Sequence, residues 1–192
     1  DGTIQPARIS INGMSTDTFP VVKTIQPDAQ LPLQIVKSGS TPVYITAYQR
    51  WQNPAPAPKT DIFEITSQLL SLNGTPLSAL QYGEKAILEV HVKAKSTANY
   101  VMIEVPIPAS CTYGEKAQQS RWRGPEVHRE YFKDRTSIFC ERLETGDYTF
   151  RIELEPRFTG TFTLNPARAE QMYFPVFYGR NEVKKVRVGS GF

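Results

Sequence analysis

The fold is decided by the stretch Ile87-Leu88-Glu89-Val90-His91-Val92-Lys93, in which apolar and polar side chains alternate. Successive side chains of a β-strand point to opposite faces, so Leu88, Val90 and Val92 share one face and the polar residues share the other. The segment Tyr148–Glu155 repeats this pattern. Because clean alternation is typical of antiparallel sheets with one face in water, it predicts an all-β sandwich rather than a doubly wound sheet.

Strand patterns recur along the chain, and fifteen prolines and twelve glycines separate them. A single segment, Asn165–Met172, suits a helical turn, because Pro166 fits a first helical position. The predicted strands are Ala7–Asn12, Phe19–Gln26, Leu31–Lys37, Pro42–Arg50, Phe63–Leu70, Ala86–Ala94, Tyr100–Ile107, His128–Arg135, Ser137–Arg142, Tyr148–Glu155, Gly160–Leu164 and Lys184–Val188.

A proline-rich stretch, Asn53-Pro54-Ala55-Pro56-Ala57-Pro58, interrupts the strand pattern. Alternating proline cannot donate hydrogen bonds to a sheet and favours an extended connection, which suits either a linker or a long crossing between sheets. We therefore expect a small β-sheet unit over residues 1–58 and an antiparallel β-sandwich over 59–192. The first unit has few apolar residues per strand, so we expect it to pair with other residues or to leave an exposed edge.

Charge and hydropathy argue against nucleic acid and against a membrane span. The net charge is +3 and the pI is about 8.8, with Lys and Arg scattered among acidic residues rather than clustered in a basic stripe. No run approaches the roughly 18 apolar residues that a spanning helix needs. We expect membrane contact only through a lipid anchor upstream of this chain.

The sequence offers no converging set of catalytic groups. His91 and His128 belong to no HExxH motif and have no second His one helical turn away, so each is interpreted as a solvated imidazole. Ser110-Cys111 lacks the flanking glycines of a nucleophile elbow. We therefore predict no catalytic residue, no metal site and no cofactor, and thus no enzyme.

Two further features have a functional and a structural interpretation. Cys111 and Cys140 form an even pair that permits a disulfide worth about 3–4 kcal/mol, or they are two buried free thiols. The run Arg121-Trp122-Arg123 places an aromatic ring between two arginines, which suits an interaction loop or a loop anchored by its Trp.

Four segments resemble, in order, motifs of the last macroglobulin-like domain of bacterial α2-macroglobulins: Tyr100–Ala109, Arg129–Phe139, Leu143–Phe150 and Pro166–Pro175. The resemblance implies a fibronectin-III-like sandwich. Residues 1–58 are similar to the strands that complete a CUB-type sandwich in that family, which implies a partial sandwich there. The motif residues, for which the resemblance implies a structural role, are Pro108, Asp134, Arg135, Gly146, Glu170, Met172, Tyr173 and Pro175.

The resemblance also implies a function. It implies that the chain is a non-catalytic structural and interaction module. This module would lie at the C-terminus of a large, broad-spectrum protease inhibitor of the bacterial periplasm or cell surface. Its partners would be the thioester domain and other macroglobulin-like domains of the parent, with target proteases engaged through the parent. The family's Cys-x-Glu-Gln thioester motif is absent here. The alternative is a fibronectin-like binding module that recognises a glycan or a host protein through loops such as Gln118–Gly124.

Overall fold

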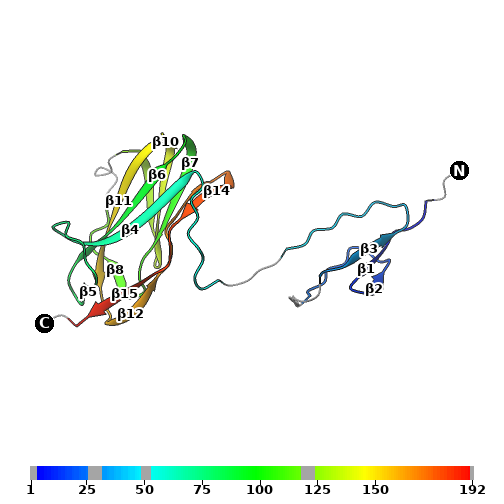
Figure 1. Cartoon of the computed structure of the whole chain (residues 1–192), viewed down its shortest axis with the longest axis horizontal. Coiled ribbons are helices and arrows are strands. Elements are labelled where there is room, and N and C mark those ends of the chain that lie inside the picture. Colours follow the sequence, from blue (N-terminus) through cyan, green and yellow to red (C-terminus); the bar gives the residue numbers. More distant parts are fainter. Residues whose placement is uncertain (1–3, 26–31, 49–52, 118–123, 191–192) are drawn as a thin grey trace. The chain divides into compact units, whose positions relative to one another are not determined.

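The computed structural model describes residues 4–25, 32–48, 53–117 and 124–190. Within these ranges the regular elements are β-strands, which confirms the all-β prediction (Figure 1). The chain forms two compact units, Asp1–Gln52 and Asn53–Phe192, whereas the expected boundary lay between Pro58 and Lys59. No helix in the described ranges is long and apolar enough to cross a membrane.

The first unit is a small antiparallel sheet. Its strands are β1 (Arg8–Ile11), β2 (Met14–Thr16) and β3 (Ile35–Ser38), in the order β2-β1-β3. The turn between β1 and β2 is made by Asn12 and Gly13, whose φ angles of 47° and 82° are those that Asn and Gly adopt most readily.

Two of the strands predicted for this unit, Phe19–Gln26 and Pro42–Arg50, are wrong over the residues that the structure describes. Residues 19–25 and 42–48 form no strand, although both are rich in β-branched and aromatic residues. Their side chains are exposed, Val22 by 93% and Tyr44 by 97%. High β-propensity reflects a fit to a half-buried pleated surface, and among the described residues of this unit no neighbouring strand provides that surface for these two segments.

The second unit is a sandwich of antiparallel sheets, shown as two layers in Figure 1. One sheet has the order β14-β13-β7-β10-β9 and the facing sheet the order β4-β6-β11-β8, while β12-β15-β5 form a small third sheet in which β15 and β5 are parallel. The bounds are β4 (Phe63–Ser71), β5 (Leu80–Gln81), β6 (Ala86–Ala94), β7 (Ala98–Pro106), β8 (Cys111–Tyr113), β9 (Glu126–Tyr131), β10 (Arg135–Leu143), β11 (Gly146–Pro156), β12 (Gly160–Leu164), β13 (Arg168–Gln171), β14 (Phe174–Arg180) and β15 (Lys184–Gly189).

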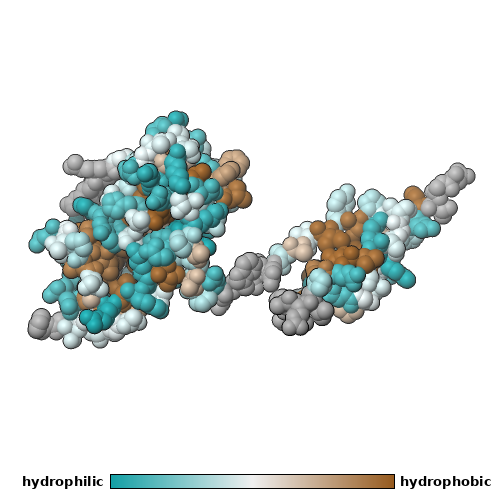
Figure 2. Space-filling model, in the orientation of Figure 1, coloured by the Kyte–Doolittle hydropathy of each residue, from teal (hydrophilic) through white to brown (hydrophobic). Residues whose placement is uncertain are grey.

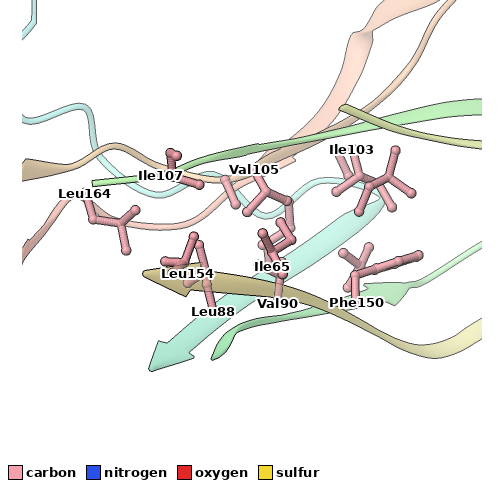
Figure 3. Packing of buried hydrophobic residues seen from close by; sticks show 14 of the residues in the cluster. Ile65, Leu88, Val90, Ile103, Val105, Ile107, Phe150, Leu154 and Leu164 are labelled. Carbon is pink, nitrogen blue, oxygen red and sulfur yellow. The ribbon is translucent and has the colours of Figure 1, made fainter. Parts of the chain in front are cut away.

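The core lies between the two larger sheets and is made by the alternation that the sequence displays. Val90 of β6 and Ile103 of β7 are fully buried. Figure 3 shows Ile103 and Val105 of one layer pointing toward Ile65, Val90 and Phe150 of the other. Burying each such side chain stabilises the fold by roughly 1.5–3 kcal/mol. Because a shift of one residue would move these side chains into water, their burial fixes the pairing register of each strand that lines the core.

A buried polar side chain joins the two sheets where the chain passes from β14 to β15. The Asn181 side chain accepts a hydrogen bond from the Ala167 backbone N–H (2.7 Å) and donates one to Ser67 Oγ (2.8 Å). Lys184 Nζ donates to the Ser67 carbonyl (2.6 Å). Because both hydrogen-bonding groups of the amide are satisfied, Asn181 can be buried without the penalty of an unpaired polar group.

The predicted helical turn at Asn165–Met172 is wrong, because Arg168–Gln171 is strand β13. Ala169 is fully buried, while its neighbours Arg168 and Glu170 lie on the opposite face of the strand and are half-buried. This two-residue period matches the ladders that β13 makes with β7 and β14 on either side.

The two cysteines are free and buried, so the candidate disulfide is not formed in this structure. Cys111 lies on β8 of one sheet and Cys140 on β10 of the other. Burial, together with the nearby Glu126 carboxylate, raises the pKa of the Cys140 thiol to about 12. Burial also raises the pKa of Cys111. Both residues therefore act as small apolar side chains of the core.

A buried carboxylate organises the outer face of the β4-β6-β11-β8 sheet. Glu89 is 4% exposed and accepts hydrogen bonds from Gln68 Nε2 (2.8 Å), Arg151 Nε (2.7 Å) and His91 Nε2 (2.9 Å). His91 Nδ1 in turn lies 3.0 Å from Thr149 Oγ1. Burial by itself would raise the pKa of Glu89, but the bonds from Gln68, Arg151 and His91 outweigh it and lower the pKa.

We predict that Glu89 makes the stability of the fold sensitive to acid. Because its pKa is lowered from 4.5 by folding, its stabilising contribution is present above pH 4.5 and is lost as the pH falls through the folded value. Urea unfolding at pH 7, 5, 4 and 3 should show a shallower acid loss for Glu89→Gln than for the wild type. Glu64→Gln, at an exposed site of the same face, serves as the control. Equal pH slopes for Glu89→Gln and the wild type would contradict the assignment.

We predict that neither thiol of the native protein reacts readily with an aromatic disulfide reagent at pH 8. With a pKa of about 12, roughly one Cys140 in ten thousand is a thiolate at that pH, and burial blocks access to both residues. Unfolding in guanidinium without a reductant should release two titratable thiols. If the unfolded, unreduced protein released none, the cysteines would be joined after all.

Candidate interaction surface

The second unit carries a run of exposed apolar residues on the β13–β14 hairpin. Figure 2 shows hydrophobic residues gathered at the end of this hairpin. We call this group the hairpin patch, and its members with their exposed fractions are Met172 (42%), Tyr173 (70%), Phe174 (63%), Val176 (68%) and Phe177 (43%). Monomeric proteins seldom expose contiguous apolar side chains of this size unless the surface meets a partner.

A break in strand pairing produces the patch. Glu170 pairs with Tyr178, but the next residue, Gln171, pairs with Phe174, so the register shifts between these two steps. Three residues of β14, 175–177, therefore have no opposite residue on β13. Such a bulge turns side chains away from the regular sheet faces.

The opposite end of β14 is held close to the sandwich. Gly179 is buried, and a Cβ atom there would overlap the carbonyl oxygen of Phe63 on β4. The next residue, Arg180, exchanges backbone hydrogen bonds with Lys59 (2.9 and 3.0 Å) and donates from Nε to the Ala57 carbonyl (2.8 Å). The hairpin is thus anchored at its base and apolar at its tip.

Cations surround a tyrosine ring at this base. Lys59 Nζ lies 3.9 Å from the centroid of the Tyr178 ring, and the guanidinium carbons of Arg168 and Arg180 lie at 4.4 and 6.0 Å. Arg168 also forms an ion pair with Glu170, one of the motif residues. These contacts hold the charged groups against the aromatic face and add to the anchoring of β14.

The tip of the hairpin is tied to β7. The Met172 N–H donates to the Tyr100 carbonyl (2.8 Å), and the rings of Tyr100 and Tyr173 meet edge to face with centroids 5.3 Å apart and an interplanar angle of 83°. Tyr100 is itself 51% exposed and extends the apolar surface onto β7. The motif residue Pro175 accepts a hydrogen bond from Arg168 (3.5 Å).

The remaining motif residues lie at strand ends away from the hairpin tip. Arg135 at the start of β10 donates to Glu104 (3.0 Å) and to Asp134 (3.2 Å). Pro108 is buried and its carbonyl accepts the N–H of Cys111 (2.9 Å). Gly146 opens β11. The structure therefore brings Glu170, Met172, Tyr173 and Pro175 together on one hairpin and places the other four motif residues elsewhere.

The candidates for chemistry are engaged in other contacts. His91 lies in the Glu89 network, and His128 lies 3.3 Å from Glu130 and stacks on Phe139 with ring centroids 5.7 Å apart. In the part of the chain that the structure describes, no three His, Cys, Asp or Glu residues form a group that could hold a metal ion. The candidate interaction loop, Arg121-Trp122-Arg123, lies outside the described residues.

The sequence-based interpretation missed four members of this surface: Tyr100, Phe174, Val176 and Phe177. A signal was present, because Met172–Tyr178 is an uncharged run of apolar and aromatic residues without alternation. Such a run predicts either a strand buried on both faces or an exposed apolar edge, and only the tertiary structure distinguishes these.

The small unit also exposes apolar side chains. Within its described residues, the buried hydrophobic side chains are Ala7 and Ile9. The exposed large hydrophobic residues are Ile4, Met14, Phe19, Val22, Ile25, Leu33, Val36, Tyr44, Ile45 and Tyr48. A unit with so small a core is expected to need further residues to cover it.

The chain resembles solved bacterial structures in fold. A mutant Salmonella alpha-2-macroglobulin superposes with a TM-score of 0.72 at 17% identity, covering 98% of this chain and 13% of that chain. Escherichia coli alpha-2-macroglobulin activated by porcine elastase gives a TM-score of 0.64 at 15% identity, covering 96% and 18%. Native alpha-2-macroglobulin from Escherichia coli, spanning domain MG7 to the C-terminus, gives 0.61 at 18% identity, covering 69% and 24%. The chain thus spans less than a quarter of each relative's length.

No curated protein matches the chain. A protein family does match: residues 63–175, from the start of β4 into β14, fit the bacterial alpha-2-macroglobulin MG10 domain. The match includes β13, the hairpin turn and the first residues of β14. The chain therefore belongs to the bacterial alpha-2-macroglobulin MG10 domain family.

Proposed function

We propose that this chain is a non-catalytic structural and interaction module of a larger alpha-2-macroglobulin-like protease trap, and that its hairpin patch packs against the parent's thioester domain. The observation that carries the proposal is the hairpin patch itself. Its five apolar residues are exposed together on one hairpin of a unit that has an extensive buried core. Covering them would stabilise the assembled parent by the ordinary hydrophobic effect.

An internal partner suits this surface better than a transient one. The patch is rich in aromatic residues and Met and has no charged member, a composition typical of the buried centre of an interface. The chain covers only 13–24% of the related proteins, so a parent of similar size would contain domains able to cover the patch permanently. Release of this contact after cleavage by a target protease would then change the conformation of the parent.

The absence of chemistry in this module is part of the proposal. Each thiol is buried with a raised pKa, which disfavours the nucleophilic thiolate. The Glu89 carboxylate is held ionised by three donors, and the same bonds occupy the oxygens that a general base would need. The bait and thioester chemistry would belong to other domains, in the periplasm or at the cell surface.

We further propose that the small unit is completed by strands of the parent that lie outside this chain, as in a CUB-type sandwich. Its sheet has three short strands and two buried hydrophobic residues in the described ranges. The alternative function, recognition of a glycan or host protein, relied on the loop at Arg121-Trp122-Arg123, and no observation favours it.

We predict that polar substitution within the hairpin patch opens the parent without a protease. Tyr173→Ser and Phe177→Ser together should remove two anchors worth about 2 kcal/mol each at the centre of an interface. Native-gel mobility and small-angle scattering of the full-length parent should then show the protease-activated shape before any protease is added.

Phe158→Ser provides the matched control, since Phe158 is 65% exposed between β11 and β12 and lies outside the patch. This variant should keep the native shape. The proposal fails if the double variant also keeps the native shape and captures a test protease as the wild type does. Binding of the isolated chain to a glycan array would favour the alternative function instead.

We predict that residues 53–192 fold alone and that residues 1–52 do not. The larger unit has an extensive core, whereas burial of Ala7 and Ile9 cannot offset the roughly 1.5 kcal/mol per residue that ordering a chain costs. Thermal unfolding followed by circular dichroism should give a sigmoidal transition for 53–192 and none for 1–52. A cooperative transition in the isolated small unit would contradict this view.

A further inference from the structure

Tyr100 has an unusual backbone conformation. Its φ of +52° lies in the left-handed region, where Asn12 is the other non-glycine residue of the described ranges. Asn12 lies in a turn and is of a type that tolerates this region, but Tyr100 lies within strand β7 and carries a bulky side chain. An aromatic residue with such a φ in a strand is an outlier that the surrounding structure must hold in place.

The conformation interrupts the pairing of β7 with β10 at a single step. Val101 pairs with Cys140 and Asn99 pairs with Arg142, while Tyr100 has no partner in this ladder. Asn99 and Tyr100 are both exposed between buried neighbours, so the alternation of the strand is interrupted there. The pairs on both sides keep the same register, so no residue is inserted, and Tyr100 lies across from Glu141 without forming a paired step.

The core does not explain why this position holds tyrosine. Tyr100 is 51% exposed, so it contributes little to the sandwich interior, and glycine would adopt the same backbone without a steric penalty. What tyrosine adds is its edge-to-face contact with Tyr173, beside the hydrogen bond from the Met172 N–H to its carbonyl. Both contacts end on the tip of the hairpin.

We propose that Tyr100 is a positioning residue that holds the Met172–Tyr173 tip in one conformation before it docks. The left-handed backbone places the Tyr100 carbonyl and ring against the tip. The hydrogen bond from Met172 and the ring contact with Tyr173 in turn stabilise this backbone conformation. A tip ordered in advance loses less conformational entropy on docking, so the same apolar contacts bind more tightly. The link to docking rests on the function proposed above, while the ordering of the tip is a property of this chain alone.

The test uses the whole chain with Tyr100→Phe, Tyr100→Ala and Tyr100→Gly. At an ordinary strand position Gly is less stable than Ala. At this position the left-handed backbone should reverse the order, with a folded-to-unfolded ratio roughly tenfold larger for Gly than for Ala. Hydrogen exchange of the Met172 amide should be roughly tenfold faster in both variants than in the wild type, and unchanged in Tyr100→Phe.

Tyr82→Ala is the control, because Tyr82 is also 51% exposed and is not part of the hairpin. It should leave the exchange of Met172 unchanged. Two results would overturn the inference: a Gly variant less stable than the Ala variant, or wild-type exchange of Met172 in Tyr100→Ala. Because neither measurement involves the parent, a failure here is distinguishable from a failure of docking.

Discussion

The second unit depends on the burial of one apolar face of β7 against the facing faces of β6 and β11. Val90, Val92, Val101 and Ile103 are all fully buried there. A shift of any of these strands by one residue would move its apolar side chains into water, so the core fixes the register. The register of β7 then sets the position of β13 beside it, and through β13 the place where the hairpin emerges.

The strands that line this core could be predicted from the sequence, because alternation is visible wherever one face is buried and the other is wet. Ala86–Ala94 and Gly160–Leu164 were predicted with the bounds that the structure has. The segments 19–25 and 42–48 were predicted wrongly, because β-propensity does not reveal whether a partner strand exists. The hairpin patch could not be derived, since its exposure results from a register shift at Glu170 that no local pattern encodes.

The motif residues divide in a way that their spacing along the chain does not indicate. Glu170, Met172, Tyr173 and Pro175 share the hairpin, whereas Arg135 and Asp134 form an ion-pair group with Glu104 at another strand end. Both groups were expected to be structural. The exposed fraction of Tyr173 distinguishes the hairpin group. Tyr173 is 70% exposed, although the N–H of its neighbour Met172 is hydrogen-bonded to Tyr100 of β7. Rigid support beneath exposed aromatic residues is the arrangement that a specific interface requires.

The pairing of β15 has a consequence for how the unit folds. Val188 near its end lies beside Leu80 of β5 and opposite Gly160 of β12, and both Val188 and Leu80 are buried. The sandwich is therefore closed by contacts between residues far apart in sequence, which form slowly because a long loop must be ordered first. During synthesis the earlier strands emerge before β15, so their apolar faces stay only partly packed until β15 pairs with β12 and β5.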